Sequence, residues 1–116
     1  MAITKLEALQ AIDREKDYLC SVSDKIWDNP ETAFEEYVSA DALCEALEHE
    51  GFTVEKNVAD IKTAFTGTWG SGKPVVGFLG EFDALSGLSQ EAGNAVKTPL
   101  VEGAPGHGCG HNLRRS

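Results

Sequence analysis

Apolar side chains in the first quarter of the chain follow a helical period. They recur at Leu6, Leu9, Ile12, Leu19, Val22 and Ile26, which is the spacing of one face of a helix. Thr4 and Glu7 have the spacing of a capping box at its start, and Asn29-Pro30 ends it. The pattern predicts a long amphipathic helix whose charged residues 13–17 form a solvated face.

A second helix is predicted from about Glu36 to Glu50, with Gly51 as its C-terminal stop. Its buried stripe is expected to be Val38, Ala42, Leu43, Ala46 and Leu47. His49 in its last turn is placed to interact with the negative end of the helix dipole. Glu31 and Glu35 precede this helix, and we expect them to favour its amino end and not to bind a metal.

Three strands are predicted after the helices, at residues 52–58, 63–69 and 74–79. The first two show alternation or enrichment in β-branched and aromatic side chains. Residues 70–73 have the composition of a hairpin turn. They do not form a phosphate-binding loop, since no Ser or Thr follows Lys73 and Pro74 opens a strand. Residues 86–106 lack periodicity and predict a long loop, of the kind that borders a binding site or is disordered.

The segment Gly106-His107-Gly108-Cys109-Gly110-His111-Asn112 contains the clearest candidate chemistry. In an extended loop, Gly110 would let Cys109 and His111 face one ion, and His107 is a third candidate. Thiolate and imidazole ligands suit zinc or a similar transition metal. The alternative is a buried thiol with histidines that cap a turn, and the surrounding glycines and nearby carboxylates argue against it.

Glu81 and Asp83 follow the apolar run of residues 75–79. If that run is a buried strand, both carboxylates lie at its carboxyl end, where open α/β sheets bind their ligands. They could then ligate a metal or orient a metal-bound histidine. The alternative is a strand-end turn that faces water.

Residues 80–90 and 106–113 resemble the metal-site segments of the M20 metallopeptidase and amidohydrolase family. Residues 26–32, 34–36, 39–40 and 51–54 are similar to the way those proteins begin. On pattern alone the chain is α/β or α+β. The resemblance implies an α/β fold, with residues 1–116 forming the N-terminal half of an α/β/α catalytic domain without an internal boundary.

The resemblance also implies an activity and a site. The activity is cleavage of an amide bond with two divalent ions, manganese or zinc, in p-aminobenzoyl-glutamate or another N-acyl amino acid or dipeptide. It makes Cys109 and His111 metal ligands and Asp83 a supporting residue. Glu81 stands where other branches have a metal-binding histidine, and it is a candidate supporting side chain together with His107 and Asn112.

The family resemblance further implies that the chain is a fragment. Family members continue after the His-Asn-Leu segment and supply a catalytic glutamate and further ligands, whereas here Leu113 is followed by Arg114-Arg115-Ser116. We therefore expect the isolated chain to be inactive, and either marginally stable or oligomeric. Related enzymes pair homologous subunits, which makes such a subunit or a second copy the expected protein partner.

Two alternatives to a metal-dependent hydrolase remain at this point. In the first, Cys109 is a nucleophile activated by His107 or His111, as in cysteine hydrolases. In the second, the chain is a remnant that binds metal weakly or not at all. Thiol alkylation with and without a chelator separates a nucleophile from a metal ligand.

Composition narrows the class of protein. The 116 residues include 19 acidic and 10 basic side chains, for a net charge of -9, which argues against non-specific binding to nucleic acid or anionic membranes. Three cysteines at wide spacing do not predict a disulfide framework and suggest a reducing cytoplasm. Residues 1–9 do not read as a secretory signal, and no apolar run approaches membrane-spanning length.

Overall fold

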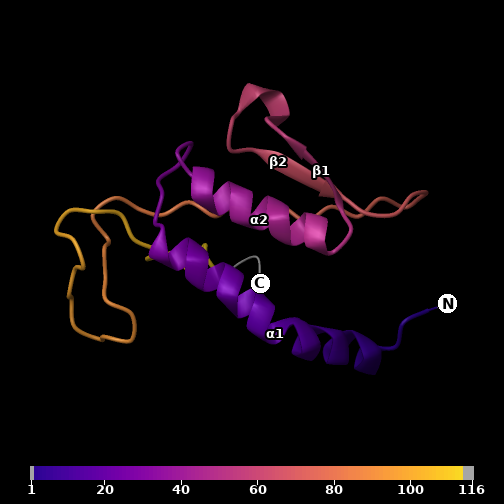
Figure 1. The fold of residues 1–116 in the computed structure, drawn as a ribbon, viewed down its shortest axis with the longest axis horizontal. Coiled ribbons are helices and arrows are strands. Elements are labelled where there is room, and N and C mark those ends of the chain that lie inside the picture. Colours follow the sequence, from indigo (N-terminus) through magenta and orange to yellow (C-terminus); the bar gives the residue numbers. More distant parts are fainter. Residues whose placement is uncertain (1, 114–116) are drawn as a thin grey trace.

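The computed structural model describes residues 2–113, and it contains two helices and a two-stranded sheet (Figure 1). Helix α1 spans Lys5–Asp28 and α2 spans Tyr37–His49. Strand β1 spans Thr53–Lys56, a short 3-10 helix (η1) spans Val58–Asp60, and β2 spans Phe65–Thr68. The prediction of an α/β chain with two helices preceding its strands is therefore confirmed at this level.

Helix α1 begins at the predicted capping box. The Thr4 hydroxyl accepts a hydrogen bond from the Glu7 N–H at 3.2 Å, and the Thr4 N–H donates to the Glu7 carboxylate at 2.8 Å. The first half of its apolar stripe does not pack, since Leu6, Leu9 and Ile12 are 64%, 50% and 59% exposed. The apolar face of the predicted amphipathic helix is therefore not packed at this end of α1, because no other described element reaches it.

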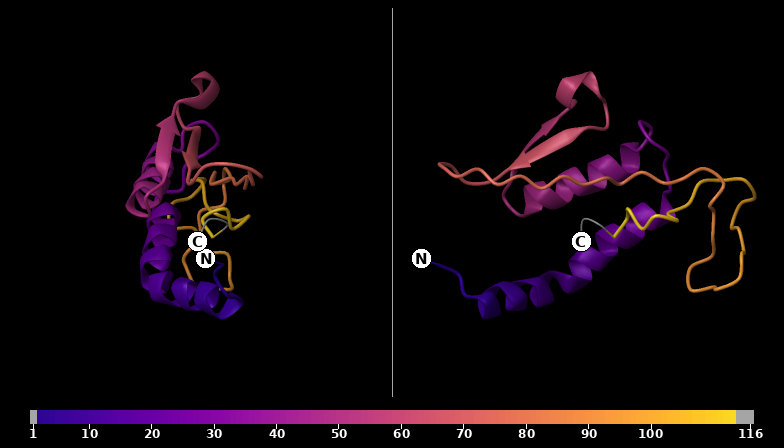
Figure 2. Two further views of the ribbon diagram at one scale, coloured as in Figure 1. Left: turned by 90° about the vertical axis from the view of Figure 1, so that its right-hand side faces the viewer. Right: turned by 180° about the vertical axis from the view of Figure 1, so that it is seen from behind.

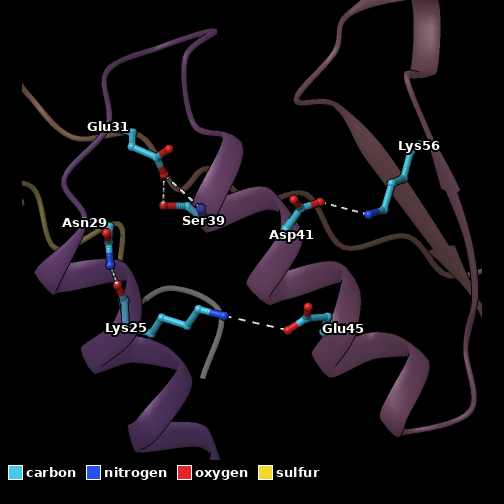
Figure 3. Close-up of polar contacts among 7 residues, drawn as sticks. All are labelled: Lys25, Asn29, Glu31, Ser39, Asp41, Glu45 and Lys56. Carbon is cyan, nitrogen blue, oxygen red and sulfur yellow. Dashed lines mark hydrogen bonds and ion pairs between the residues drawn. The ribbon is translucent and has the colours of Figure 1, made fainter.

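Helix α2 receives its N-terminal cap from a residue outside the helix. The Glu31 carboxylate accepts hydrogen bonds from the N–H groups of Val38 and Ser39 at 2.9 and 2.8 Å, and from the Ser39 hydroxyl at 2.7 Å (Figure 3). A carboxylate is favoured there because it pairs unbonded N–H groups at the positive end of the dipole. The structural role predicted for Glu31 is thus confirmed. Gly51, at φ +85°, ends the helix as expected.

Strands β1 and β2 pair antiparallel, from Thr53 opposite Thr68 to Lys56 opposite Phe65. Both strands contact α2, and the Lys56 ammonium lies 2.8 Å from the Asp41 carboxylate on that helix (Figure 3). Gly67 lets β2 approach closely, since a Cβ at this position would lie 2.8 Å from Leu47 Cδ1. The hairpin is therefore held against the second helix.

The predicted third strand at residues 74–79 does not form. Residues 70–83 run as an extended segment alongside α2, without ladder pairing to any described strand (Figure 2). Val75, Val76, Phe78 and Leu79 are 85%, 72%, 93% and 100% exposed. An isolated apolar run has no partners for its backbone groups, so the pattern alone does not create a strand.

The core is small and lies between the second half of α1 and α2. Its buried apolar members are Ile26, Ala40, Ala42, Leu43, Cys44 and Ala84. An exposed ion pair, Lys25 to Glu45 at 3.7 Å, also links the two helices (Figure 3). Ala84 matters for the site, because this buried residue directly follows Asp83 in the chain. Within residues 2–113, no helix has both the length and the apolar character needed to cross a bilayer.

Candidate functional site

Three segments lie side by side next to the core and position the candidate residues. Ala84 forms a parallel bridge with Thr32, and its N–H donates to the Glu31 carbonyl at 2.7 Å. Leu85 forms an antiparallel bridge with Gly106 through hydrogen bonds of 3.0 and 2.9 Å. The chain around Asp83 is thereby fixed between the α1–α2 connection and the start of the Cys-His loop, which comprises residues 106–112.

The long loop at residues 86–105 lacks helix and strand, as predicted, and projects beyond the ends of the helices (Figure 2). It is ordered by local hydrogen bonds. The Gln90 amide donates to the Asn94 and Val96 carbonyls at 3.0 and 2.8 Å, and its oxygen accepts from the Thr98 N–H at 2.9 Å. At its base, the Ser89 N–H donates to the Ala104 carbonyl at 3.0 Å.

Two glycines allow the base of this long loop to pack on the Cys-His loop. A Cβ at Gly106 would lie 1.9 Å from the Leu88 carbonyl oxygen, and one at Gly108 would lie 2.5 Å from Leu88 Cδ1. At Gly106 the obstacle is backbone, so an added side chain would force the chain to move, whereas at Gly108 the flexible end of the Leu88 side chain would have to shift. Glycine is thus required at Gly106 by close approach of another backbone, a reason that concerns packing and not ligand binding.

The Cys-His loop is not extended, which corrects the expected geometry. It makes two successive turns, in which the Gly110 N–H donates to the His107 carbonyl at 3.2 Å and the Leu113 N–H donates to the Gly110 carbonyl at 3.0 Å. Gly110 is left-handed, at φ +69°. Cys109 is exposed in the first turn, while the His111 side chain is only 13% exposed.

His111 is flanked by both predicted carboxylates. Its Nδ1 lies 2.8 Å from Asp83 Oδ1, and its Nε2 lies 3.5 Å from Glu81 Oε2. Because a carboxylate can only accept, the shorter contact assigns a proton to Nδ1, and in the neutral form of the ring the lone pair is then on Nε2. Carboxylates that orient metal-bound histidines make the same contact. Glu81 and Asp83 therefore lie beside the Cys-His loop, but the buried strand whose carboxyl end was predicted to carry them does not form.

His107 points away from these carboxylates and into the helical core. It is 6% exposed, its Nε2 lies 3.1 Å from the Ile26 carbonyl oxygen, and its ring centroid lies 6.3 Å from that of Trp27. Burial lowers the pKa of His107, and the hydrogen bond to Ile26 opposes that shift. Its role in the described structure is therefore an internal contact of a neutral ring.

Asn112 makes a comparable buried contact. It is 6% exposed, and its Nδ2 donates to the Ser23 hydroxyl at 3.3 Å. Asn112 Oδ1 and His107 Nδ1 have no hydrogen-bond partner within the described part of the chain. An unpaired buried acceptor costs about 1–3 kcal/mol. Sequence reasoning identified both side chains but not their partners on α1, because Ser23 and Ile26 read only as part of a helix face.

The donors at this site suit the metal that the resemblance implies. Cys109 offers a thiol at the surface, and His111 Nε2 lies 3.5 Å from Glu81 Oε2. This sulfur, nitrogen and oxygen set is typical of zinc sites. Within residues 2–113, however, no three His, Cys, Asp or Glu side chains are grouped closely enough to hold an ion. The described residues thus supply fitting donors without an assembled three-ligand site.

The chain has clear relatives among characterised hydrolases. It is 53% identical over 103 residues to a subunit of the p-aminobenzoyl-glutamate hydrolase of Escherichia coli, an alignment that covers 89% of this chain and 21% of that protein. It is 29% identical over 127 aligned positions to human Xaa-Arg dipeptidase, covering 97% of this chain and 25% of the relative. It is 30% identical over 99 residues to thermostable carboxypeptidase 2 of Saccharolobus solfataricus, covering 84% of this chain and 24% of that relative.

These relatives confirm the resemblance noted in the sequence, since the chain is similar both to part of an amidohydrolase and to M20-type peptidases. No model of a protein family matches the chain. The chain spans about a fifth to a quarter of the length of the curated relatives it matches.

Proposed function

We propose that this relative of p-aminobenzoyl-glutamate hydrolase forms the N-terminal part of a metal-dependent amidohydrolase. The observation that carries the proposal is the contact between His111 Nδ1 and Asp83 Oδ1 at 2.8 Å, which leaves Nε2 as the ring's electron-pair donor. The names of the aligned relatives, a hydrolase, a dipeptidase and a carboxypeptidase, support amide-bond cleavage as the reaction.

Cys109 and His111 are the proposed ligands within this chain. Cys109 would bind as the thiolate, so binding releases its proton and is weakened at low pH. Asp83 would hold the His111 ring and its tautomer, while Glu81 would add negative charge beside Nε2. The two turns of the Cys-His loop require a local change in the orientation of Cys109 if both ligands are to reach one ion.

The ion, zinc or manganese, would supply polarisation of the amide carbonyl and a water of lowered pKa. The residues of this chain would hold the ion and fix its surroundings. General acid–base transfer from water to the leaving amine needs a carboxylate, and family resemblance places that glutamate downstream of this chain. Cleavage is therefore proposed for a longer protein, and the isolated chain is expected to be inactive.

The substrate proposed is p-aminobenzoyl-glutamate, because the relative with 53% identity bears that name. Other N-acyl amino acids and dipeptides are the next class, as the dipeptidase and carboxypeptidase relatives indicate. A homologous protein partner is proposed for the same reason, since that relative is named as one subunit of its enzyme. The long loop at residues 86–105 stands next to the Cys-His loop and would border the substrate.

A cysteine-nucleophile hydrolase is the second candidate, and the geometry favours it less. A nucleophilic thiol needs a base within hydrogen-bond reach. His111 Nδ1 is instead directed to Asp83, and the Nε2 of His107 is directed to the Ile26 carbonyl. Neither histidine is hydrogen-bonded to Cys109 in the described residues.

The proposed function is tested on the chain and on a chimera in which residues 1–113 replace the matching segment of the Escherichia coli relative. Metal content after dialysis is measured by plasma mass spectrometry, and cleavage by release of p-aminobenzoate. Cys109→Ala and His111→Ala should lose metal and activity in the chimera, whereas the exposed Cys20→Ala should lose neither. Full metal content in both ligand variants would refute the assignment.

A further inference from the structure

The Cys-His loop is attached to α1 at two points, one on each side of Cys109 and His111. The first point is His107, whose Nε2–H donates to the Ile26 carbonyl at 3.1 Å. The second is Asn112, whose Nδ2 donates to the Ser23 hydroxyl at 3.3 Å. Ser23 and Ile26 are three residues apart in a helix and therefore share one face. The loop is fastened to a single stripe of α1.

The Ile26 carbonyl can accept a hydrogen bond from the histidine because of the way α1 ends. A helical carbonyl normally accepts from the N–H four residues later, but that residue is Pro30, which has no N–H. The Asn29 N–H contacts the same carbonyl at 3.2 Å, and His107 approaches it as a second donor. The carbonyl also lies at the negative end of the helix dipole, which favours a donor there.

Burial makes both attachments directional. His107, Asn112 and Ser23 are 6%, 6% and 4% exposed, so water does not compete for their hydrogen bonds. The second polar atom of His107 and of Asn112 stays unpaired within the described residues. Apolar side chains would fill this space without leaving such atoms, and they would not fix the angle at which the loop meets the helix. The polar groups therefore fix the orientation of the Cys-His loop relative to α1.

We propose that His107 and Asn112 are positioning residues, which anchor the Cys-His loop to α1 and so set how Cys109 and His111 are presented. This inference rests on the proposed function, in which those two residues bind the metal. The loop makes its two turns over residues 107–113, and within them His111 Nδ1 meets Asp83 Oδ1. Supporting hydrogen bonds of this kind typically change metal affinity 10- to 100-fold, as an order of magnitude.

The test uses three single variants of the 116-residue chain. His107→Leu removes the donor and keeps an apolar side chain in the buried site. His107→Gln keeps an N–H that can reach the Ile26 carbonyl and serves as the conservative rescue. His49→Leu is the matched control, because His49 is an exposed histidine at the end of α2. Far-UV circular dichroism first verifies that each variant keeps the helical content of the parent.

The first readout needs no metal. In proton–nitrogen spectra, His107→Leu should shift or broaden the amide signals of Cys109 and His111 while those of residues 5–15 stay in place. His107→Gln should restore the parent positions, and His49→Leu should leave them unchanged. Unaltered Cys109 and His111 signals in a folded His107→Leu chain would overturn the proposal.

The second readout is the dissociation constant for zinc ion alone, measured by titration calorimetry. We expect His107→Leu to weaken binding at least about tenfold and His107→Gln to stay within about threefold of the parent. Equal affinity in His107→Leu would also overturn the proposal. If the parent chain binds no zinc, that result counts against the proposed function of this chain, and the metal-free spectra still decide whether the anchors order the loop.

Discussion

His111 and Asp83 meet at 2.8 Å between Nδ1 and Oδ1, and this contact joins segments that are 28 residues apart in sequence. The two side chains are 13% and 28% exposed, so solvent screens their interaction less than that of a surface ion pair. The contact sets the tautomer of the proposed ligand without a strand beneath Asp83.

Asp83→Asn should therefore weaken zinc binding by the chain about 10- to 100-fold, because the amide keeps the shape of the side chain but loses the charge that orients His111. Titration calorimetry measures the change. Asp17→Asn, an exposed substitution on α1, is the control for altered net charge. The same loss of affinity in both variants would mean that overall charge and not the His111 contact is responsible.

Gly106→Ala should destabilise the chain by about 1–3 kcal/mol or more, since overpacking against a fixed neighbour forces the backbone to move. The added Cβ would lie 1.9 Å from the Leu88 carbonyl oxygen. Urea unfolding followed by circular dichroism gives the free energy. Gly77→Ala has open space around its Cβ and an ordinary φ, so it should be nearly neutral. An equal loss in both variants would contradict the packing argument.

Glu31→Ala should lower the free energy of unfolding by about 1–2 kcal/mol, the size of a lost helix cap. The carboxylate accepts three hydrogen bonds at the start of α2. The exposed Glu35→Ala is the matched control, and it should change stability by much less. Thermal melts of the two variants provide the comparison, and similar melting temperatures would rule out a capping role for Glu31.

Stability should fall at alkaline pH because of Cys44. Burial raises the pKa of this thiol in the folded chain above its ordinary value of 9.0, which the unfolded chain retains. At a pH between the unfolded and the folded pKa, the unfolded chain has therefore lost a proton that the folded chain keeps. The contribution of this thiol to the free energy of unfolding is fully present below pH 9.0 and is lost as pH rises through the pKa of the folded state. The expected slope is at most about 1.4 kcal/mol per pH unit.

Urea unfolding at a series of pH values above about 8, just below the ordinary thiol pKa, measures this slope. Cys44→Ala should be less stable at every pH because it leaves a cavity. Its free energy of unfolding should nevertheless fall less steeply with pH, because the buried thiol no longer titrates. The exposed Cys20→Ala should retain the slope of the parent. A slope that is unchanged in Cys44→Ala would assign the alkaline effect to other groups.

The exposed apolar segment around Phe78 should make the chain associate as its concentration rises. Phe78 and Leu79 are 93% and 100% exposed, and unpaired extended segments offer backbone groups to other chains. Phe78→Lys should reduce the mass seen by sedimentation at high concentration, while Ile3→Lys, another exposed apolar position, should have less effect. A monomeric mass at all concentrations with a sharp melt would contradict this expectation.

Features encoded by neighbouring residues were predictable from the sequence. The capping box at Thr4 and Glu7, the stop before Pro30 and the glycine after α2 each depend on interactions within a few positions, and all are present. The apolar run at residues 74–79 has the composition of a strand buried on both faces. Its pairing needs other segments, so composition alone could not predict its exposed state.

The sequence likewise predicted some parts of the candidate site and not others. Residue types identified His111 and Asp83, and family resemblance linked the two segments that carry them. The anchors of the loop were not predictable, because Ser23 and Ile26 carry no signal beyond helical periodicity. The turns at Gly110 were missed as well, since a glycine permits both extended and left-handed backbone. Whether Cys109 and His111 bind an ion stays a prediction.

The anchoring of the Cys-His loop on α1 also has a consequence for the order of synthesis. His107 and Asn112 bond to residues that precede them by 81 and 89 positions. When α1 leaves the ribosome, the loop residues that will contact Ser23 and Ile26 have not yet been translated. These contacts form only after residues 107 and 112 have followed. The site therefore cannot close before residue 112 is translated, and a chain halted before residue 107 would carry an α1 surface without these contacts.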